Sequence, residues 1–487
     1  MKRLGTFALA AVALVGFTSA PDKTLSNEAA KSAANDISSG RLKDFLTFIA
    51  ADALLGRDTP SPGLDAAANF IAYNLKMWGA KPAGDDGTFF QKIKLEKATI
   101  NEAMSSLTVG DTMLAYKTDF VAFGGSGKVS GELVYIEKAG QQVDVKNKVV
   151  LLAADARSEM RTLRGSGALA IISDSGQARA SFPAFVDGMR RFGGGYRPAD
   201  EGNGQGPAQT LSVTMNSDSF KDLVGKVGQT ASLNLEATMD VAYTQNIVAI
   251  VEGSDPKLKS EYVAFGAHYD HIGWNPNLKG DQIFNGADDD GSGTCSILNI
   301  AEAALKAPAR PKRSLLFVWH CGEEKGLWGS AYFNQHPTVP KENIVAQLNI
   351  DMIGRSKPAG NTNPLNKTLT GPNAVYVIGT TMMSTRLGEI VHGVNAKYLK
   401  IDYDKQYDDP KDPNRFFYRS DHYNYAKNGI PICFWFDGEH EDYHRVGDEV
   451  SKIDFNKMQN VARTVFVTGV TVANEATRPK VDKPLDR

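Results

Sequence analysis

Cysteine is scarce in this chain, and the few cysteines lie in apolar surroundings. The 487 residues include three, Cys295, Cys321 and Cys433, and each adjoins a run of apolar side chains. Such thiols are typical of a protein core, so we expect neither a disulfide framework nor a cysteine nucleophile. A chain of this length can be exported without disulfides, because its core is large enough to stabilise it.

A strong net charge and long apolar runs are missing as well. The 54 basic and 56 acidic side chains give a net charge of −2, which argues against nucleic acid or an anionic membrane as partner. Residues 4–17 form an apolar stretch that follows two basic residues and is too short to span a bilayer. Because residues 18–20 resemble a cleavage site, we expect residues 1–20 to be a signal peptide, with an uncleaved anchor as the alternative. The protein is then periplasmic or extracellular, with no stable membrane insertion after cleavage, although Pro21 leaves the cleavage position open.

Histidine is absent from the first 267 residues, and all eight histidines lie between residues 268 and 444. Helical spacing of apolar residues predicts two helices over residues 43–55 and 65–77. Residues 118–240 hold short β-type runs punctuated by glycine, without acidic residues at strand ends in a ligand-like pattern. From residue 245 onward, apolar strands alternate with helical stretches, which is typical of an α/β sheet. These patterns predict two domains, as the chain length also favours.

Candidate metal ligands follow the strands expected in this second half. His268 comes after the run 262–265, Glu323 and Glu324 after 315–319, Asp351 after 345–350, and His444 closes the loop after 432–436. Asp289 precedes a Gly-Ser-Gly sequence and a helical run, so we expect it at the entry of a helix. Because open α/β sheets bind ligands at the carboxyl ends of their strands, these side chains are expected to converge.

This set of side chains suits one chemistry. A single His-x-Asp, Glu-Glu pair or Gly-Asp loop is usually structural, and only their joint occurrence after strands favours a metal centre. Two imidazoles and three carboxylates can hold two zinc ions about 3.5–4 Å apart around a shared carboxylate. One of the paired glutamates is then free to act as a base. Zinc-bound imidazoles usually donate their other N–H to a carboxylate, and Asp270 is placed for this role beside His268, as Asp448 could be for His444.

The motifs around these residues resemble the co-catalytic zinc aminopeptidases, a family that includes secreted leucyl aminopeptidases, glutamate carboxypeptidases and glutaminyl cyclases. The matching stretches are Gly266 to Asp270, Asn285 to Gly293, Gly322 to Glu324, Asn349 to Gly354 and Tyr443-His444. Residues 118–240 resemble the protease-associated (PA) domain that such enzymes often carry as an insert. The resemblance implies an α/β/α sandwich with a mixed central sheet, interrupted by this β-rich domain. It places the zinc peptidase domain in residues 21–117 and 241–487.

The resemblance also implies a role for each residue. Asp289 would bridge the two zinc ions, with His268 and Asp351 completing one site and Glu324 and His444 the other. Glu323 would be the general base. The mechanism itself, and not the resemblance, calls for a nearby hydroxyl to stabilise the oxyanion, for which Tyr443 is a candidate, and Asp270 keeps the supporting role described above. The implied protein is a secreted metallo-aminopeptidase with two zinc ions per chain and peptides as substrates.

Several alternatives stay open at this point. A carboxypeptidase or dipeptidase of the same family would carry the same ligands. A glutaminyl cyclase would bind one zinc, which the presence of five ligands disfavours. A receptor-like protein with a dead site is disfavoured by the intact set, and a two-metal phosphoesterase by the lack of a basic phosphate pocket. Neither the preferred terminal residue nor the oligomeric state follows from the sequence.

Overall fold

The computed structural model describes residues 24–122, 125–186, 195–199, 210–483 and 485. The expected signal peptide, residues 1–20, lies outside the described residues. Within the described part, no helix combines the length and apolar character needed to cross a bilayer. The chain divides into two compact units, one formed by residues 1–91 and 245–487 and the other by Lys92–Thr244.

The larger unit is built on a mixed sheet that runs in the order β17-β16-β18-β15-β13-β14-β12-β2. β13 is parallel to both β14 and β15, and β15 is parallel to β18, whereas β12 and β16 run antiparallel to their neighbours β14 and β18. The strands are β2 (Phe90–Ile100), β12 (Ala237–Val251), β13 (Tyr262–His268), β14 (Ser314–His320), β15 (Ile344–Ile350), β16 (Ala374–Ile378), β17 (Asp402–Asp404) and β18 (Ile432–Phe436), with the short β1 (Lys81–Pro82) beside β12.

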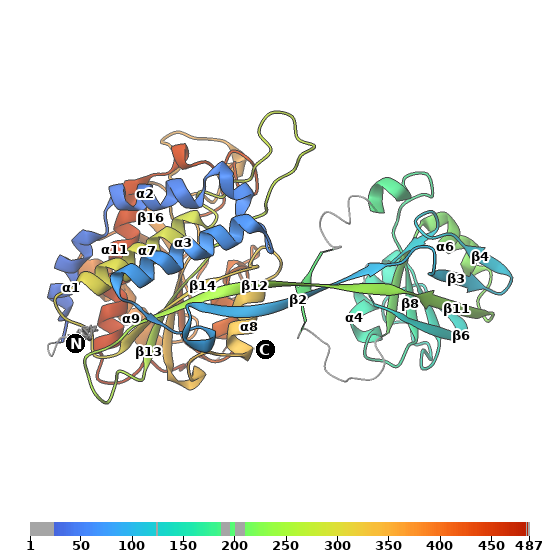
Figure 1. The fold of residues 1–487 in the computed structure, drawn as a ribbon, viewed down its shortest axis with the longest axis horizontal. Helices are drawn as coiled ribbons and strands as arrows, with labels where there is room; N and C mark the ends of the chain where they lie inside the picture. The colour runs from blue at the N-terminus through green and yellow to red at the C-terminus, as the bar shows by residue number, and fades with distance from the viewer. Residues whose placement is uncertain (1–23, 123–124, 187–194, 200–209, 484, 486–487) are drawn as a thin grey trace, which may run out of the picture. The chain divides into compact units, whose positions relative to one another are not determined.

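Helices cover both faces of this sheet. On one face α7 and α11 pack on β13 and β15, and α1, α2 and α3 lie over them (Figure 1). On the other face α8 packs on β14, and α10 packs on β15 and β18. The helices are α1 (Asn27–Ala33), α2 (Ser39–Ile49), α3 (Pro62–Trp78), α7 (Gly291–Lys306), α8 (Trp328–Gln335), α9 (Thr385–Lys397), α10 (His422–Ala426) and α11 (Phe455–Asn474).

The central strands are buried on both faces, which explains their nearly continuous apolar sequences. Every residue of β14 is buried, and alternate side chains point to opposite helix layers. Leu316 and Val318 belong to the core that includes Phe333 of α8, while the indole of Trp319 donates a hydrogen bond to the carbonyl of Thr294 in α7. The α/β class with a mixed central sheet, expected from the sequence, is thus confirmed.

The smaller unit is rich in β-structure. Its sheet has the order β4-β3-β11-β6-β7-β8-β10-β5, and β6, β7, β8 and β10 run parallel to one another. The elements are β3 (Ser106–Val109), β4 (Thr112–Leu114), β5 (Phe120–Val121), β6 (Gly127–Ile136), β7 (Val149–Leu152), α4 (Met160–Leu163), β8 (Ala170–Asp174), β9 (Arg197–Pro198), β10 (Leu211–Met215), α6 (Ser217–Val224) and β11 (Thr230–Leu235). The chain passes between the two units within β2 and β12, and residues 118–240 lie inside the smaller unit.

Candidate metal centre

The expected ligands lie at one edge of the larger sheet because the strands that carry them are parallel. His268 ends β13, Glu323 and Glu324 follow β14, and Asp351 follows β15. The loop after β18 leads to His444, and Asp289 lies just before α7. Parallel neighbours end at the same edge, so residues more than a hundred positions apart are brought within a few ångströms of one another.

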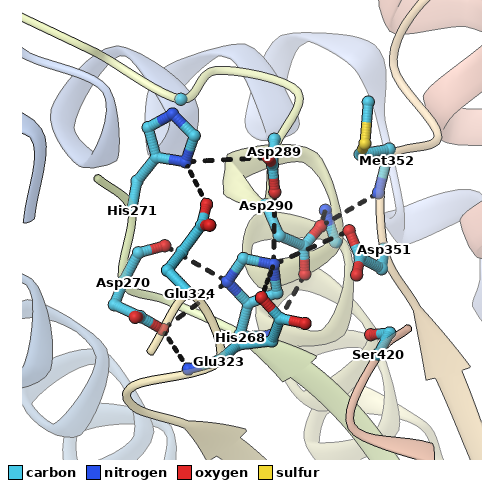
Figure 2. Close-up of polar contacts among 12 residues, drawn as sticks. His268, Asp270, His271, Asp289, Asp290, Glu323, Glu324, Asp351, Met352 and Ser420 are labelled. Atoms are coloured by element: carbon cyan, nitrogen blue, oxygen red, sulfur yellow. Dashed lines mark hydrogen bonds and ion pairs between the residues drawn. The ribbon is translucent and has the colours of Figure 1, made fainter. Parts of the chain in front are cut away.

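Asp289 lies between two groups of ligands and offers a different oxygen to each. Its Oδ1 is 3.2 Å from Nε2 of His268, and that nitrogen is 3.7 Å from Oδ1 of Asp351 (Figure 2). Its Oδ2 is 3.2 Å from Nε2 of His444, which in turn is 3.1 Å from Oε2 of Glu324. This is the arrangement that a carboxylate needs to bridge two cations.

The neighbouring Asp290 is also close to His268 and Asp351, but its oxygens are already used. Its Oδ1 accepts hydrogen bonds from the backbone N–H groups of Gly293 and Met352, and its Oδ2 accepts one from the backbone N–H of His268. Asp290 is therefore the N-cap of α7, and it also ties the segment of His268 to the segment that follows Asp351. Among the described residues, no backbone N–H group donates a hydrogen bond to the carboxylate of Asp289.

The electrostatics of the centre favour a cation. Although burial opposes protonation, the carboxylates of Asp289 and Glu324 raise the pKa of His444 to about 10. Asp351 and Glu323 likewise raise the pKa of His268 well above its ordinary value against the effect of burial. The imidazoles thus act as counter-ions for a dense group of buried carboxylates, which is the role a divalent metal ion takes in such a site.

Unpartnered buried atoms and the chemistry of the donors fit zinc as that ion. Among the described residues, Oδ2 of Asp289 and Oε1 of Glu324 are buried without a hydrogen-bond partner. Buried polar atoms are normally satisfied, and leaving one unpaired costs about 1–3 kcal/mol. Imidazole nitrogens with carboxylate oxygens are a common donor set for zinc.

Glu323 lies beside the centre without being enclosed by it. Its Oε2 is 3.9 Å from Nε2 of His268, and its side chain is 12% exposed. Burial raises the pKa of the Glu323 carboxyl well above its ordinary value, and the carboxylates of Glu324 and Asp351 add to this effect. Two divalent cations bound beside it would lower this pKa again and favour the carboxylate.

Asp270 supports both His268 and Glu323. Its Oδ1 is 3.6 Å from Nδ1 of His268 and accepts a hydrogen bond from the backbone N–H of Glu323 at 3.2 Å. Its Oδ2 accepts a hydrogen bond from the hydroxyl of Thr59. Asp448, considered as a partner for His444, instead accepts hydrogen bonds from the backbone N–H groups of Asp288 and Asp289. It positions the bridging residue, because its carboxylate faces the loop before α7.

Two residues near the centre were not identified from the sequence. His271 is fully buried, with Nδ1 at 2.8 Å from Oε1 of Glu324. Arg57 is also fully buried, and its guanidinium donates hydrogen bonds to the backbone carbonyls of Ile49, Tyr269, Asn285 and Gly286. For His271 the available signal was its place next to Asp270. For Arg57 the sequence holds no comparable signal, because its acceptors are backbone atoms.

A pocket opens directly onto the centre. Asp289, Glu323, Asp351 and His444 of the centre line it, together with both apolar and polar side chains. The side chains that line the walls are Met352, Phe416, Arg419, Ser420, Phe434, Phe436, Glu439 and Tyr443. Arg419, the one arginine or lysine among these lining residues, donates a hydrogen bond of 2.7 Å to Oε1 of Glu439. The pocket thus presents aromatic side chains beside the candidate metal centre, and the positive charge of Arg419 is already paired with Glu439.

Comparisons with known proteins find similar sequences among peptidases. Residues 246–468 match the sequence model of peptidase family M28. Leucine aminopeptidase 1 of Trichophyton equinum is 30% identical over 235 residues, which are 46% of this chain and 57% of the relative. A probable zinc metalloprotease of Pyrenophora tritici-repentis is 35% identical over 143 residues, 29% of this chain and 32% of the relative. The chain therefore spans about a third to a little over half of the length of these curated relatives.

A solved structure matches nearly the whole chain. The aminopeptidase from Aneurinibacillus sp. strain AM-1 superposes with a TM-score of 0.53 at 17% sequence identity, covering 94% of this chain and 98% of that one. At this level of identity the match establishes a shared fold.

Proposed function

We propose, from the geometry of the acidic centre and from the match of residues 246–468 to the model of peptidase family M28, that the protein is a two-zinc aminopeptidase of this family. One observation carries the proposal. Asp289 offers one oxygen to His268, beside Asp351, and the other to His444, beside Glu324. Such a bridging carboxylate between two imidazole–carboxylate pairs suits two zinc ions, whereas a one-zinc cyclase would not need both pairs.

His268, Asp289 and Asp351 would hold one zinc ion, and Asp289, Glu324 and His444 the other. When bound, the two ions acidify a water molecule and polarise the carbonyl of the scissile peptide bond. Glu323 accepts the proton of the attacking water and delivers it to the leaving amine. It can do so because its carboxyl group lies next to the centre and is not among the ligands.

Tyr443 is suited to stabilise the oxyanion that forms during attack. It lines the pocket beside His444, and burial raises the pKa of its hydroxyl, so this group stays protonated and can donate a hydrogen bond. Asp270 holds His268 in place, since its backbone carbonyl lies 3.2 Å from Nδ1 of the ring and its carboxylate 3.6 Å from the same nitrogen, and such an acceptor orients an imidazole.

The pocket favours a peptide with an apolar N-terminal residue. Met352, Phe416, Phe434 and Phe436 offer an apolar surface for a large side chain. Recognition of a C-terminal carboxylate would call for a free cation, but Arg419 is engaged by Glu439. These features support an aminopeptidase over the carboxypeptidase alternative. We also propose that the chain is exported and that residues 1–20 are removed.

A panel of blocked and free peptides tests this function. The zinc-loaded protein is assayed with Leu-Ala-Ala amide, N-acetyl-Leu-Ala-Ala amide, N-acetyl-Ala-Ala-Leu with a free carboxylate, and a glutaminyl peptide. Release of leucine from the first peptide alone is the expected result. Cleavage of only the peptide with a free C-terminus would make the protein a carboxypeptidase, and cyclisation without hydrolysis would make it a glutaminyl cyclase.

A further inference from the structure

His271 lies three residues after His268, at the beginning of the loop that follows β13, and its side chain turns into the centre (Figure 2). Its Nδ1 is 2.8 Å from Oε1 of Glu324 and 3.8 Å from Oδ2 of Asp289. The ligand atoms of these three residues all lie within 4.8 Å of one another, and the imidazole is completely buried. None of the roles proposed above uses His271.

The contact between His271 and Glu324 is close but is not aligned as a hydrogen bond. Within the described part of the chain, neither ring nitrogen of His271 has a hydrogen-bond partner, and Oε1 of Glu324 and Oδ2 of Asp289 have none either. A buried histidine normally satisfies at least one ring nitrogen, because an unpaired polar atom in the interior is costly. A nitrogen and two oxygens that are unpaired, buried and convergent are arranged as ligands around a shared cation.

The backbone around His271 fixes the ring in this position. Gly286 has a φ of +57°, and a Cβ atom there would lie 2.5 Å from Cγ of His271, so the glycine leaves room for the imidazole. The backbone N–H of His271 donates to the carbonyl of Arg57, whose guanidinium binds the carbonyls of Tyr269 and Gly286. The loops on both sides of the ring are therefore tied to one buried arginine.

We propose that His271 is a third histidine ligand of the two-metal centre, and that it binds, through Nδ1, the cation held by Asp289, Glu324 and His444. This inference rests on the proposed function for the existence of the centre. It makes the two metal positions unequal. The position with His271 has four protein ligands, two imidazoles and two carboxylates, while the position of His268, Asp289 and Asp351 has three and is therefore the more open to substrate or water.

The inequality has a consequence for metal retention. His444 is 39% exposed, whereas His271 is completely buried. His271 therefore secures the metal from the interior, on the side of the pair that solvent does not reach. We expect the position at Glu324 to fill first and to release its metal last.

A cysteine substitution tests the ligation directly. In His271→Cys the sulfur should reach the metal about as well as Nδ1 does, since both atoms lie within two bonds of Cβ. A thiolate is a good ligand for zinc and cobalt. The Co²⁺-loaded variant should show a thiolate-to-cobalt charge-transfer band in the near ultraviolet that Co²⁺-loaded wild type lacks. Absence of the band in a folded, cobalt-loaded variant would overturn the proposal.

Metal affinity separates a ligand from a residue that only positions Glu324. His271→Asn keeps a hydrogen-bond donor but is a poor zinc ligand. If His271 binds the metal, the tighter of the two zinc affinities should fall by more than about 100-fold in this variant. The loss of a residue that only positions a ligand typically lowers metal affinity by about 10–100-fold. X-ray absorption of the wild-type zinc form should count three imidazoles over two metals, and two in the variant. An affinity close to that of wild type, with an unchanged imidazole count, would refute the ligation.

His392→Asn is the matched control, because His392 lies in α9 and its Nε2 contacts the hydroxyl of Thr380. It should keep both zinc affinities. The thermal unfolding of each apo variant shows whether the fold is retained. If wild type itself binds no zinc, the proposed function fails; if wild type binds two and His271→Asn is unchanged, only the present inference fails.

Discussion

The adjacent residues Glu323 and Glu324 have different jobs in this account, and isosteric substitution separates them. Glu323→Gln removes the proton acceptor while keeping size and polarity. Oε2 of Glu323 is 3.9 Å from the nearest imidazole nitrogen, so no ligand is lost and zinc content should stay near two. General-base catalysis contributes about 10²–10⁴-fold. The turnover number should fall by this factor, which corresponds to about 2.7–5.5 kcal/mol of barrier height.

Glu324→Gln should impair zinc binding directly and turnover only as a consequence. Its two oxygens lie 2.8 Å from Nδ1 of His271 and 3.1 Å from Nε2 of His444, so the substitution removes a charged ligand from one metal position. Zinc affinity should fall first, and activity should partly return with excess zinc, because the base is intact. The measurements are zinc content after dialysis and hydrolysis of a leucyl peptide across a zinc titration.

The pair of variants can refute the assignment in two ways. If Glu323→Gln loses metal while Glu324→Gln keeps it, the two roles are reversed. If both variants hydrolyse the peptide like wild type, neither residue is catalytic. Circular dichroism of both proteins confirms that the comparison is made between folded chains.

Three further predictions follow. Chelation should abolish peptide hydrolysis, and added zinc should restore it. Hydrolysis that persists after exhaustive chelation would contradict this prediction. Replacing residues 92–244 by a short linker should leave zinc binding intact, because every candidate ligand lies outside this segment. Asn246 also hydrogen-bonds to Gln91, so the two ends that the linker would join are already held together. A folded deletion variant that binds no zinc would show that the smaller unit supports the site. Burial lowers the pKa of His422 to about 4, so stability should be full above about pH 6.5 and decrease by about 3 kcal/mol as the pH falls towards 4. His422→Gln, which cannot titrate, should show a smaller drop in Tm between pH 7 and 5, and equal drops would contradict the prediction.

Much of the centre was predictable because it depends on strand direction. A carboxylate or imidazole placed after an apolar run such as 315–319 is carried to the sheet edge wherever the run becomes a parallel strand. The structure brings His268, Glu324 and Asp351 together for this reason, and Asp289 and His444 join them from the entry of α7 and from the loop after β18. Their assignment as zinc ligands stays a prediction until metal is measured.

Other features depend on contacts that no local pattern reveals. His271 follows Asp270 in a loop, and its position depends on Gly286, which leaves room for the ring, and on the guanidinium of Arg57, which binds the carbonyl of Gly286. Similarly, the choice between Asp289 and Asp290 depends on three backbone N–H groups that come from separate segments. The beginning of the smaller unit was equally hard to locate, because β2 is continuous from one unit into the other, with no Pro or Gly to mark the boundary.

The central claim is that this edge of the sheet holds two metal ions around Asp289. Crystals of the zinc-loaded protein, measured on both sides of the zinc absorption edge, test it most directly. The account predicts two anomalous peaks per chain, one beside His268 and Asp351 and the other beside Glu324 and His444, with Asp289 in contact with both. A single peak, or two peaks that do not share Asp289, would contradict it.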